Sequence, residues 1–367
     1  MTSIKRIVLT GGPCAGKTTA LVRINEHFSA LGYKVFMVPE VPTMITQSGW
    51  NYLTDNKDFY YEGEKVILET QLELEDKVMR LAQTCTEPCV IVCDRGAMDI
   101  SAYISAEMWN ELTQACGTST EELRTGSRYD AVLHLVSAAD GAEQFYTTAN
   151  NAQRYEKADE AGLAIARELD RKVIEAWTGH PHLRVINNGE DFEQKMNRVI
   201  HEISAVLGLP QPIEEERKYI VKLTGELPPC TESEIIQTYL VAEPGTEVRL
   251  RRRCTNGNVV NIHTTRKRIS PTEELVTERQ VTNALYESLL QQADPYRCPI
   301  RKRRRSFIYK GQFFELDAYT GKLDGLVILE TKGIACHADL KIPPFLHIEQ
   351  DITGNTDYYN ATLALRR

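Results

Sequence analysis

The sequence predicts two domains of different fold class, an α/β domain with a parallel doubly wound sheet and then an α+β domain of antiparallel strands. Its 367 residues suggest about two domains. In residues 1–207, short apolar runs alternate with amphipathic helical stretches, which is typical of βαβ units. In residues 214–367, strands alternate apolar and charged residues, and helices are few. Residues 208–213 are rich in proline and form a short, stiff connector.

Composition and charge narrow the classes of protein. A hydrophobic content of 42% and a charged content of 26% are those of a soluble globular protein. The net charge of −8 gives no bulk electrostatic case for nucleic acid, so we expect no nucleic-acid partner. Nine cysteines without C-x-x-C spacing indicate reduced thiols. With no signal peptide and no apolar run long enough to span a bilayer, we expect a cytoplasmic protein, at most peripheral to membranes.

The first predicted strand leads into a glycine-rich loop and a helix. Residues 7–10 are followed by the pattern G-x-x-x-x-G-K-[ST], and Leu21, Ile24 and Phe28 then recur at helical spacing. Glycines let backbone N–H groups converge on a phosphate, and the helix points its positive end at the same place. Lys17 is expected to contact the β- and γ-phosphates, and Thr18 the metal ion. We therefore predict a site for Mg²⁺ with ATP or GTP, formed by Gly11, Gly12, Pro13, Cys14, Ala15, Gly16, Lys17, Thr18 and Thr19.

Two further strand ends carry charged residues. Glu40 follows the apolar run 35–38 and is interpreted as a general base or substrate-orienting residue, or else as a solvated loop residue or helix cap. The run 89–93 ends in Asp94, the Walker B arrangement that holds Mg²⁺ through water. Arg95 follows directly and is interpreted either as a substrate or phosphate contact or as a member of a structural ion pair. The Asp-Arg-Gly run that it belongs to resembles nucleoside and nucleotide kinases. The predicted catalytic residues are Lys17, Glu40, Asp94 and Arg95.

The rest of the first domain is expected to supply a lid and a loop near the base. Arg154, Arg167 and Arg171 lie in a helical stretch that forms a lid over the transferring phosphate in small kinases; solvated arginines are the alternative. We predict Arg154 as a nucleotide contact. His134, inside a fourth strand, is interpreted as a core residue, and residues 187–189 follow a fifth strand where base contacts are often made. The N-K-x-D motif of GTPases is absent, which favours ATP but leaves GTP open. This domain resembles the nicotinamide-riboside-kinase-like P-loop ATPases.

Charged residues in the second domain recur at strand period on shared faces. These sets are Glu214, Glu216 and Lys218, then Arg249, Arg251 and Arg253, and then His263, Thr265 and Lys267. So many charges cannot all face a dry core. Either the sheet has one solvated face, or it closes into a barrel whose cations bind phosphates and whose carboxylates hold a divalent ion.

The run Glu214-x-Glu216-x-Lys218 matches the E-x-E-x-K signature of CYTH domains, the triphosphate tunnel family. With the P-loop domain in front, the whole chain resembles the TRPL translocation defect protein 14 family. The resemblance implies an antiparallel β-barrel (a triphosphate tunnel) that binds a phosphorylated polyanion, either a phosphoinositide head group or polyphosphate. It implies ligands for a second divalent ion, Mg²⁺ or Mn²⁺, at Glu214, Glu216 and Glu330. It implies polyanion contacts at Lys218, Arg249, Arg251, Lys267 and Arg303, with Glu278, Glu315 and Asp317 as further tunnel residues.

One position departs from the catalytic members of that family. A second glutamate is expected two residues after Glu330, where this chain has Lys332. A cation in place of a metal ligand argues against a two-metal hydrolase and favours a tunnel that binds its polyanion without cleaving it. We therefore expect a P-loop NTPase or phosphotransferase coupled to a polyanion-binding domain, as a trafficking or regulatory adaptor. The alternatives are a small-molecule, nucleoside-type kinase and an inorganic triphosphatase.

Overall fold

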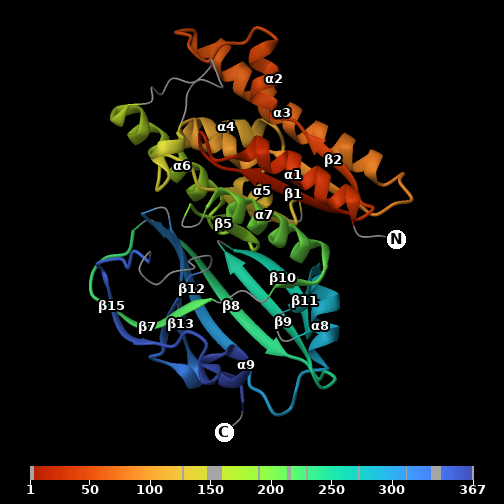
Figure 1. Cartoon of the computed structure of the whole chain (residues 1–367), viewed down its shortest axis with the longest axis vertical. Coiled ribbons are helices and arrows are strands. Elements are labelled where there is room, and N and C mark those ends of the chain that lie inside the picture. The colour runs from red at the N-terminus through yellow and green to blue at the C-terminus, as the bar shows by residue number, and fades with distance from the viewer. Residues whose placement is uncertain are drawn as a thin grey trace. The chain divides into compact units, whose positions relative to one another are not determined.

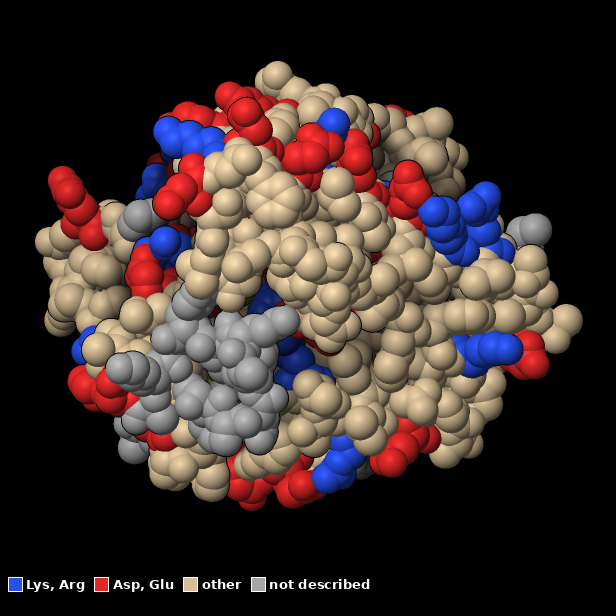
Figure 2. Space-filling view, turned by 90° about the horizontal axis from the view of Figure 1, so that it is seen from above, with Lys and Arg blue, Asp and Glu red and all other residues tan. Residues whose placement is uncertain are grey.

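Figure 1 shows the computed structural model of the chain. It describes residues 4–125, 128–146, 159–188, 191–212, 216–228, 230–255, 257–270, 273–310, 312–331 and 340–365. The chain forms two compact units, Met1–Ile200 and His201–Arg367. Across the described ranges, no helix is both long and apolar enough to cross a membrane. On the face seen in Figure 2, basic side chains are interspersed with acidic ones and do not form one broad basic field.

The first unit is built on a sheet of five parallel strands in the order β2-β3-β1-β4-β5, which confirms the predicted doubly wound α/β class. The central strands are buried on both faces because helices cover both, so their sequences are continuously apolar. The strands are β1 (Lys5–Thr10), β2 (Lys34–Val38), β3 (Cys89–Asp94), β4 (Ala131–Leu135) and β5 (Leu183–Ile186).

The helices of this unit begin where the sequence supplies caps. Asn56 accepts the N–H groups of Asp58 and Phe59 at the start of the long helix α3, and Asp159 accepts the N–H of Gly162 at the start of α6. The α-helices are α1 (Lys17–Ala30), α2 (Val41–Gln47), α3 (Lys57–Ala82), α4 (Ala106–Ala115), α5 (Thr120–Thr125), α6 (Glu160–Trp177) and α7 (Phe192–Leu207). Short 3₁₀ turns are η1 (Ala97–Ala102) and η2 (Glu143–Phe145).

The second unit is built on a ten-stranded antiparallel sheet in the order β15-β7-β14-β13-β12-β8-β9-β10-β11-β6, as the predicted fold class requires. The strands are β6 (Gln211–Pro212), β7 (Arg217–Leu223), β8 (Thr231–Tyr239), β9 (Thr246–Thr255), β10 (Asn258–Arg268), β11 (Glu273–Val281), β12 (Ile300–Tyr309), β13 (Gln312–Tyr319), β14 (Val327–Thr331) and β15 (Leu346–Asp351). Outside the sheet lie α8 (Asn283–Leu290), η3 (Gly321–Leu323), η5 (Thr356–Tyr358) and α9 (Asn360–Leu363).

This sheet curves strongly around one of its faces. Glu216, which precedes β7, is among the charges that raise the pKa of Arg249 on β9 against the effect of burial. Five strand pairings separate β7 from β9 in the sheet order, and in a flat sheet they would lie roughly 24 Å apart at about 4.8 Å per pairing. Charges at that distance would barely interact. The sheet therefore bends and brings its two halves to face each other across a polar interior.

The two faces of the curved sheet differ in chemistry. The outer face carries an apolar cluster that includes Phe307, Phe314 and Leu329. The inner face is polar along most of its length. At one end of the inner face, the C-terminal segment packs Ile352 and Ala364 onto apolar inner-face residues, namely Tyr239, Ile300, Tyr319 and Ile328. Because this packing closes one end, a ligand on the polar part of the inner face would enter from the other end.

Candidate functional site

The glycine-rich loop of the first unit has the backbone geometry that its glycines make possible. Gly11 has a φ of +142°, and a Cβ atom there would lie 2.1 Å from the carbonyl oxygen of Leu135. Gly16 has a φ of +91° in the left-handed region, at the N-cap of α1. Neither position accepts a larger residue without strain. The loop thus turns tightly from β1 into α1, as a phosphate-binding loop must.

Lys17 is folded back onto this loop. Its Nζ donates to the carbonyl oxygens of Gly11 at 2.7 Å and Gly12 at 3.1 Å. Burial, together with the charge of Arg95, lowers the pKa of Lys17 to about 8, although Glu40 and Asp94 oppose this shift. The ammonium group is therefore held beside the loop among the other three predicted catalytic residues, where an incoming phosphate would compete with the two carbonyls.

Asp94 ends β3 next to β1, where Leu9 is its partner in register. Its Oδ1 is buried and has no hydrogen-bond partner among the described residues. Burial raises the pKa of the Asp94 carboxyl, which Lys17 partly offsets. An oxygen ligand that is buried and unsatisfied suits a hard divalent cation. Thr18, in the exposed first turn of α1, supplies the second predicted ligand, and P-loop nucleotide sites generally use such an ion. The residues present therefore fit a Mg²⁺ ion.

Glu40 and Arg95 form an ion pair beside Lys17. Arg95 Nε donates to Glu40 Oε1 at 2.5 Å, and Thr43 Oγ1 donates to Glu40 Oε2 at 2.7 Å. Burial would raise the pKa of Glu40, but Arg95 and Thr43 outweigh it and lower the pKa to about 2. Although Glu40 is at the N-cap position of α2, its side chain makes no capping bond. Such an acidic carboxyl is a weak general base, so Glu40 fits the role of orienting Arg95 better.

Arg95 is itself held in an unusual position. Its φ of +71° is in the left-handed region, which is strained for a non-glycine residue. Its guanidinium lies over the ring of Tyr103, with Cζ 5.7 Å from the centroid. Within the described part of the chain, Arg95 Nη1 is buried with no hydrogen-bond partner. The structure thus brings together Lys17, Glu40, Asp94 and Arg95, and it leaves one buried donor and one buried acceptor unsatisfied there.

Asp170, which sequence reasoning missed, secures the same loop from α6. Its Oδ1 accepts the N–H of Gly12 at 2.6 Å and contacts His134 Nε2 at 3.1 Å, and its Oδ2 accepts the N–H of Ser137 at 3.2 Å. Burial alone would raise the pKa of Asp170, but His134 and the two N–H donors lower it. The sequence offered one signal for Asp170, because it is a charged residue at a position of α6 that helical spacing places among the buried apolar residues. His134 is fully buried, as its interpretation as a core residue requires.

Other predicted contacts of the first unit are placed differently. Arg171 pairs with Glu168 and Glu175 on the exposed side of α6, which is the solvated alternative. The amide of Asn188 is used internally, because Nδ2 donates to the carbonyl oxygens of Ser137 at 2.7 Å and Asp140 at 2.8 Å. Asn188 is therefore not arranged to read a base. Arg154 lies outside the described residues.

The inner face of the second unit has one wall where acids and bases pair. Lys218 Nζ lies 3.0 Å from Glu216 and 3.1 Å from Glu330. Arg304 contacts Asp317 at 2.6 Å, Glu315 at 2.5 Å and Glu330 at 3.0 Å, and Lys302 also pairs with Asp317. Arg304 and Lys302 hold the pKa of the fully buried Asp317 below its usual range despite burial. The charges on this wall are balanced by one another.

The opposite wall, formed by β9, carries cations with little compensation. Arg249 contacts Glu247 at 3.6 Å and Glu278 at 3.8 Å. Neither Arg251 nor Arg253 makes an ion pair within the described ranges; Arg253 Nε donates only to Ser233 Oγ, at 3.0 Å. Burial lowers the pKa of Arg251 and of Arg253 to about 10; neighbouring arginines add to this shift, whereas Glu278 opposes it at Arg251 and Glu315 opposes it at Arg253. Among the described residues, Arg251 and Arg253 therefore carry charges that no ion pair cancels.

Two predicted polyanion contacts are not brought to these walls. Lys267 is exposed. In the pairing of β10 with β9, Thr264 is opposite Arg249 and shares its side of the sheet. Lys267 lies three residues after Thr264, so its side chain points to the other side of the sheet from Arg249. Arg303 is exposed on the outer side of β12 and pairs with Glu232 at 3.3 Å. Its neighbours Lys302 and Arg304 face inward instead. A run of five consecutive basic residues, 301–305, gives no alternation from which the inward positions could be identified.

The described acids of the second unit do not by themselves form a metal site. In the described ranges, no group of three or more Asp, Glu, His or Cys side chains could hold an ion. Glu330 is bonded to Lys218 and Arg304. Glu214 and Lys332 lie outside the described residues. The second divalent ion expected from the resemblance therefore gains no support from the acids that are described.

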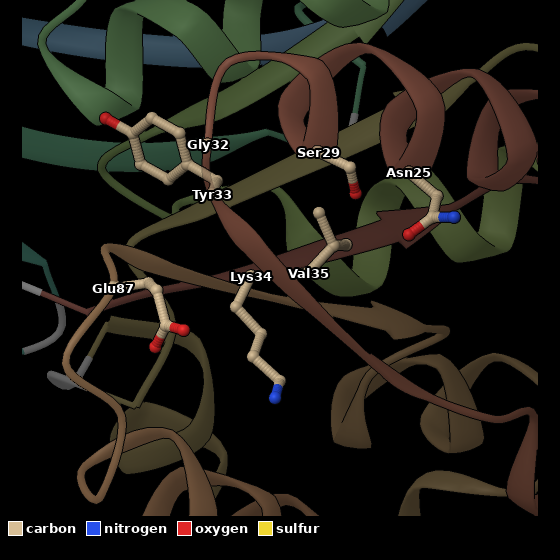
Figure 3. Close-up of a pocket in the computed structure, with 7 residues that line it drawn as sticks. All are labelled: Asn25, Ser29, Gly32, Tyr33, Lys34, Val35 and Glu87. Carbon is tan, nitrogen blue, oxygen red and sulfur yellow. The ribbon is translucent and has the colours of Figure 1, made fainter.

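A shallow pocket lies away from these sites. It has a volume of about 360 Å³ and is lined by residues that include Ser29, Tyr33, Lys34 and Glu87, shown in Figure 3. Lys34 begins β2, and Glu87 precedes β3. These are the amino ends of parallel strands, whereas the phosphate loop, Glu40 and Asp94 lie at the carboxyl ends. The pocket is therefore on the opposite edge of the sheet from the candidate nucleotide site.

Comparisons with known proteins agree with the loop geometry. A family model described as "AAA domain" matches residues 6–195. No curated protein matches. Among solved structures, the hypothetical protein NE1496 is 26% identical with a TM-score of 0.33, covering 42% of this chain and 99% of that one. The inorganic triphosphatase NE1496 has the same identity and TM-score, with coverages of 42% and 97%. PH1819 from Pyrococcus horikoshii OT3 is 20% identical with a TM-score of 0.26, with coverages of 32% and 77%. At such TM-scores, the structural likeness carries no functional argument.

Proposed function

This chain belongs to the AAA domain family of P-loop nucleotide-binding proteins, and from that premise we propose that it couples two anion sites. The first unit binds a nucleoside triphosphate with Mg²⁺ and transfers or releases its terminal phosphate. The second unit binds a phosphorylated polyanion on its β9 wall, and the chain acts as a nucleotide-dependent adaptor for that polyanion. The observation that carries the proposal is the pair of inner-face arginines, the half-buried Arg251 and the buried Arg253, which form no ion pair with any described acid.

The residues of the first unit have distinct roles in this proposal. Lys17 leaves the carbonyls of Gly11 and Gly12 and binds the β- and γ-phosphates. Thr18 and Asp94 hold the Mg²⁺, which neutralises negative charge on the phosphates. Arg95, oriented by Glu40, offers Nη1 to an oxygen of the transferred phosphate or of its acceptor. These contacts position the phosphates and stabilise charge, which is the main part of phosphoryl-transfer catalysis.

The second unit is proposed to bind rather than to cleave. A phosphate group between Arg249, Arg251 and Arg253 would supply negative charge that no described ion pair gives to Arg251 and Arg253, and charge-assisted hydrogen bonds to phosphate are strong. On the opposite wall, each of the described carboxylates Glu315, Asp317 and Glu330 pairs with a cation, namely Arg304, Lys302 or Lys218, so none of these three is left for a metal ion. A phosphoinositide head group and a short polyphosphate share the required chemistry.

A nucleoside-type kinase is the second candidate for the first unit. The Glu40–Arg95 pair is compatible with it, because the pair lies after β2 and at the end of β3, at the edge of the sheet where a phosphoryl acceptor would be oriented. Transfer of labelled phosphate from ATP to a nucleoside, abolished by Lys17→Ala, would select the kinase. Release of phosphate to water alone would select the NTPase.

A thermal-shift panel tests the coupled proposal. Wild type, Lys17→Ala, Arg251→Ala and the outward control Arg303→Ala are each heated with MgATP, MgGTP, tripolyphosphate or inositol hexakisphosphate. A ligand at 100 times its dissociation constant stabilises by about 2.7 kcal/mol, which is readily measured. We expect K17A to lose only the nucleotide response, R251A to lose only the polyanion response, and R303A to lose neither.

Other outcomes separate the alternatives. A polyanion response that survives R251A, or one lost equally in R303A, would refute the site on β9. Binding of R251A to phosphoinositide vesicles as tightly as wild type would refute the adaptor role. Phosphate release from tripolyphosphate with Mg²⁺ or Mn²⁺ that stops in Glu216→Gln would establish a triphosphatase instead.

A further inference from the structure

Lys195 is a buried lysine behind the phosphate loop to which the proposed chemistry gives no part. It lies in the first turns of α7 with only 3% of its surface exposed. Its Nζ donates to the carbonyl oxygen of Val136 at 2.8 Å and to Asn188 Oδ1 at 2.6 Å. Val136 follows β4 and Asn188 follows β5. One ammonium group therefore joins a helix to the ends of two strands at the carboxyl edge of the sheet.

Hydrogen bonds continue from Lys195 to the phosphate loop. Asn188 Nδ2 donates to the carbonyl oxygens of Ser137 and Asp140. Ser137 Oγ donates to the carbonyl oxygen of Pro13 at 2.5 Å, and the N–H of Ala138 donates to the carbonyl oxygen of Cys14 at 3.3 Å. Pro13 and Cys14 form the crown of the loop, where Cys14 has a positive φ of 55°. The crown is thus held from behind by the segment that Lys195 and Asn188 secure.

The described surroundings of Lys195 are polar but contain little compensating charge. Asp170 from α6 is the nearby acid, and it is already bonded to Gly12, Ser137 and His134 of β4. Lys17 from α1 is the nearby cation. Burial and Lys17 together lower the pKa of Lys195 to about 7, against the opposing effect of Asp170. Its described partners are carbonyl oxygens, so no ion pair among the described residues cancels its charge.

We propose that Lys195 is a positioning residue of the nucleotide site, which holds the segment after β4 against Pro13 and Cys14 and so fixes the crown that receives the phosphates. This inference rests on nucleotide binding by the first unit. Because the bound triphosphate is strongly anionic and lies on the far side of that crown, it favours the charged form of Lys195. With a pKa of about 7, Lys195 is partly neutral at pH 7 and gains protons when nucleotide binds, whereas Lys17, with a pKa of about 8, gains fewer.

Isothermal titration calorimetry of the full chain with Mg²⁺ and the non-hydrolysable analogue AMP-PNP tests this at pH 7. Titrations in two buffers of different ionisation enthalpy give both the affinity and the protons taken up. Wild type is compared with Lys195→Met, Lys195→Arg and Lys172→Met, whose lysine is an exposed residue of α6. We expect K195M to bind at least tenfold more weakly and to lose most of the proton uptake. K195R should keep most of the affinity without the uptake, and K172M should match wild type.

Each other outcome counts against the inference. If K195M binds AMP-PNP with wild-type affinity and uptake, Lys195 has no positioning role. If K195M does not fold, the proton uptake of K195R decides. Arginine stays charged at pH 7 and cannot take up a proton, so K195R with the same proton uptake as wild type would also overturn the assignment. If wild type itself fails to bind AMP-PNP and GMP-PNP, the proposed nucleotide function has failed, and this result is distinct from a failure of Lys195 alone.

Discussion

Replacing Arg253 by methionine should make the ligand-free protein more stable and its polyanion binding weaker. Arg253 is 7% exposed and has no described acidic partner. A pKa lowered from 12.5 to about 10 means that its charge costs the folded state up to about 3 kcal/mol. Loss of the bond to Ser233 Oγ takes back about 1 kcal/mol. Because methionine fills similar space without charge, the net gain is about 1–2 kcal/mol.

The assay combines a melting curve with calorimetry against tripolyphosphate and inositol hexakisphosphate. For a domain of this size, the gain corresponds to roughly 2–8 °C in Tm. The cost of the buried charge applies at every pH below about 10, so the gain should not change between pH 6 and pH 9. Removal of one charge-assisted bond to phosphate should weaken binding about tenfold or more. The outer-face control Arg305→Met, whose arginine pairs with Glu232 at 2.8 Å, should show neither effect.

Two results would refute this reasoning. If R253M melts below wild type, the guanidinium is compensated in a way that the described contacts omit. If R253M is more stable and still binds both polyanions with wild-type affinity, the destabilising buried charge of Arg253 does not contribute to binding. Opposite changes in stability and affinity are the signature of a residue kept for function.

Three further predictions concern other charged groups. Asp94→Asn should weaken nucleotide binding at least tenfold with Mg²⁺ present but little in EDTA, as titration calorimetry would show; equal losses in both would argue against a metal role. Because phosphate binds the ammonium form of Lys17, whose pKa is lowered to about 8, affinity should fall more steeply above pH 8 than near pH 7, where only Lys195 contributes, and Lys17→Met should remove the added steepness. Arg304→Met should leave Asp317 buried beside Lys302 alone and cost about 3–5 kcal/mol in urea unfolding; a loss below 1 kcal/mol would contradict the described network.

Local patterns predicted the first unit well. The phosphate loop, the strand that ends in Asp94 and the strand that leads to Glu40 are contiguous runs whose chemistry depends on near neighbours in the sequence. Parallel sheet order then brings the carboxyl ends of β2, β3 and β1 together. Asp170 and Lys195 were missed because their partners lie far along the chain, so only the folded structure shows which loops they hold.

In the second unit, alternation along a strand predicted shared faces but not which face is enclosed. The set containing Lys267 was correctly grouped, yet the register with β9 puts it opposite the arginines. All five residues of the run 301–305 are basic, so both faces of this strand look alike in the sequence. The sequence therefore contained no signal for choosing Lys302 and Arg304 over Arg303 as the inward residues. Arg154, Glu214 and Lys332 lie outside the described residues, so the roles expected of them remain predictions.

The central claim is that this chain has two separate anion sites, and one competition measurement tests it most directly. Wild type is saturated with Mg²⁺ and AMP-PNP and then titrated with tripolyphosphate in the calorimeter. The account predicts a second binding event of near-unit stoichiometry that persists in Lys17→Ala and disappears in the Arg251→Ala, Arg253→Ala double variant. Displacement of AMP-PNP by tripolyphosphate, with both ligands lost in Lys17→Ala, would contradict it.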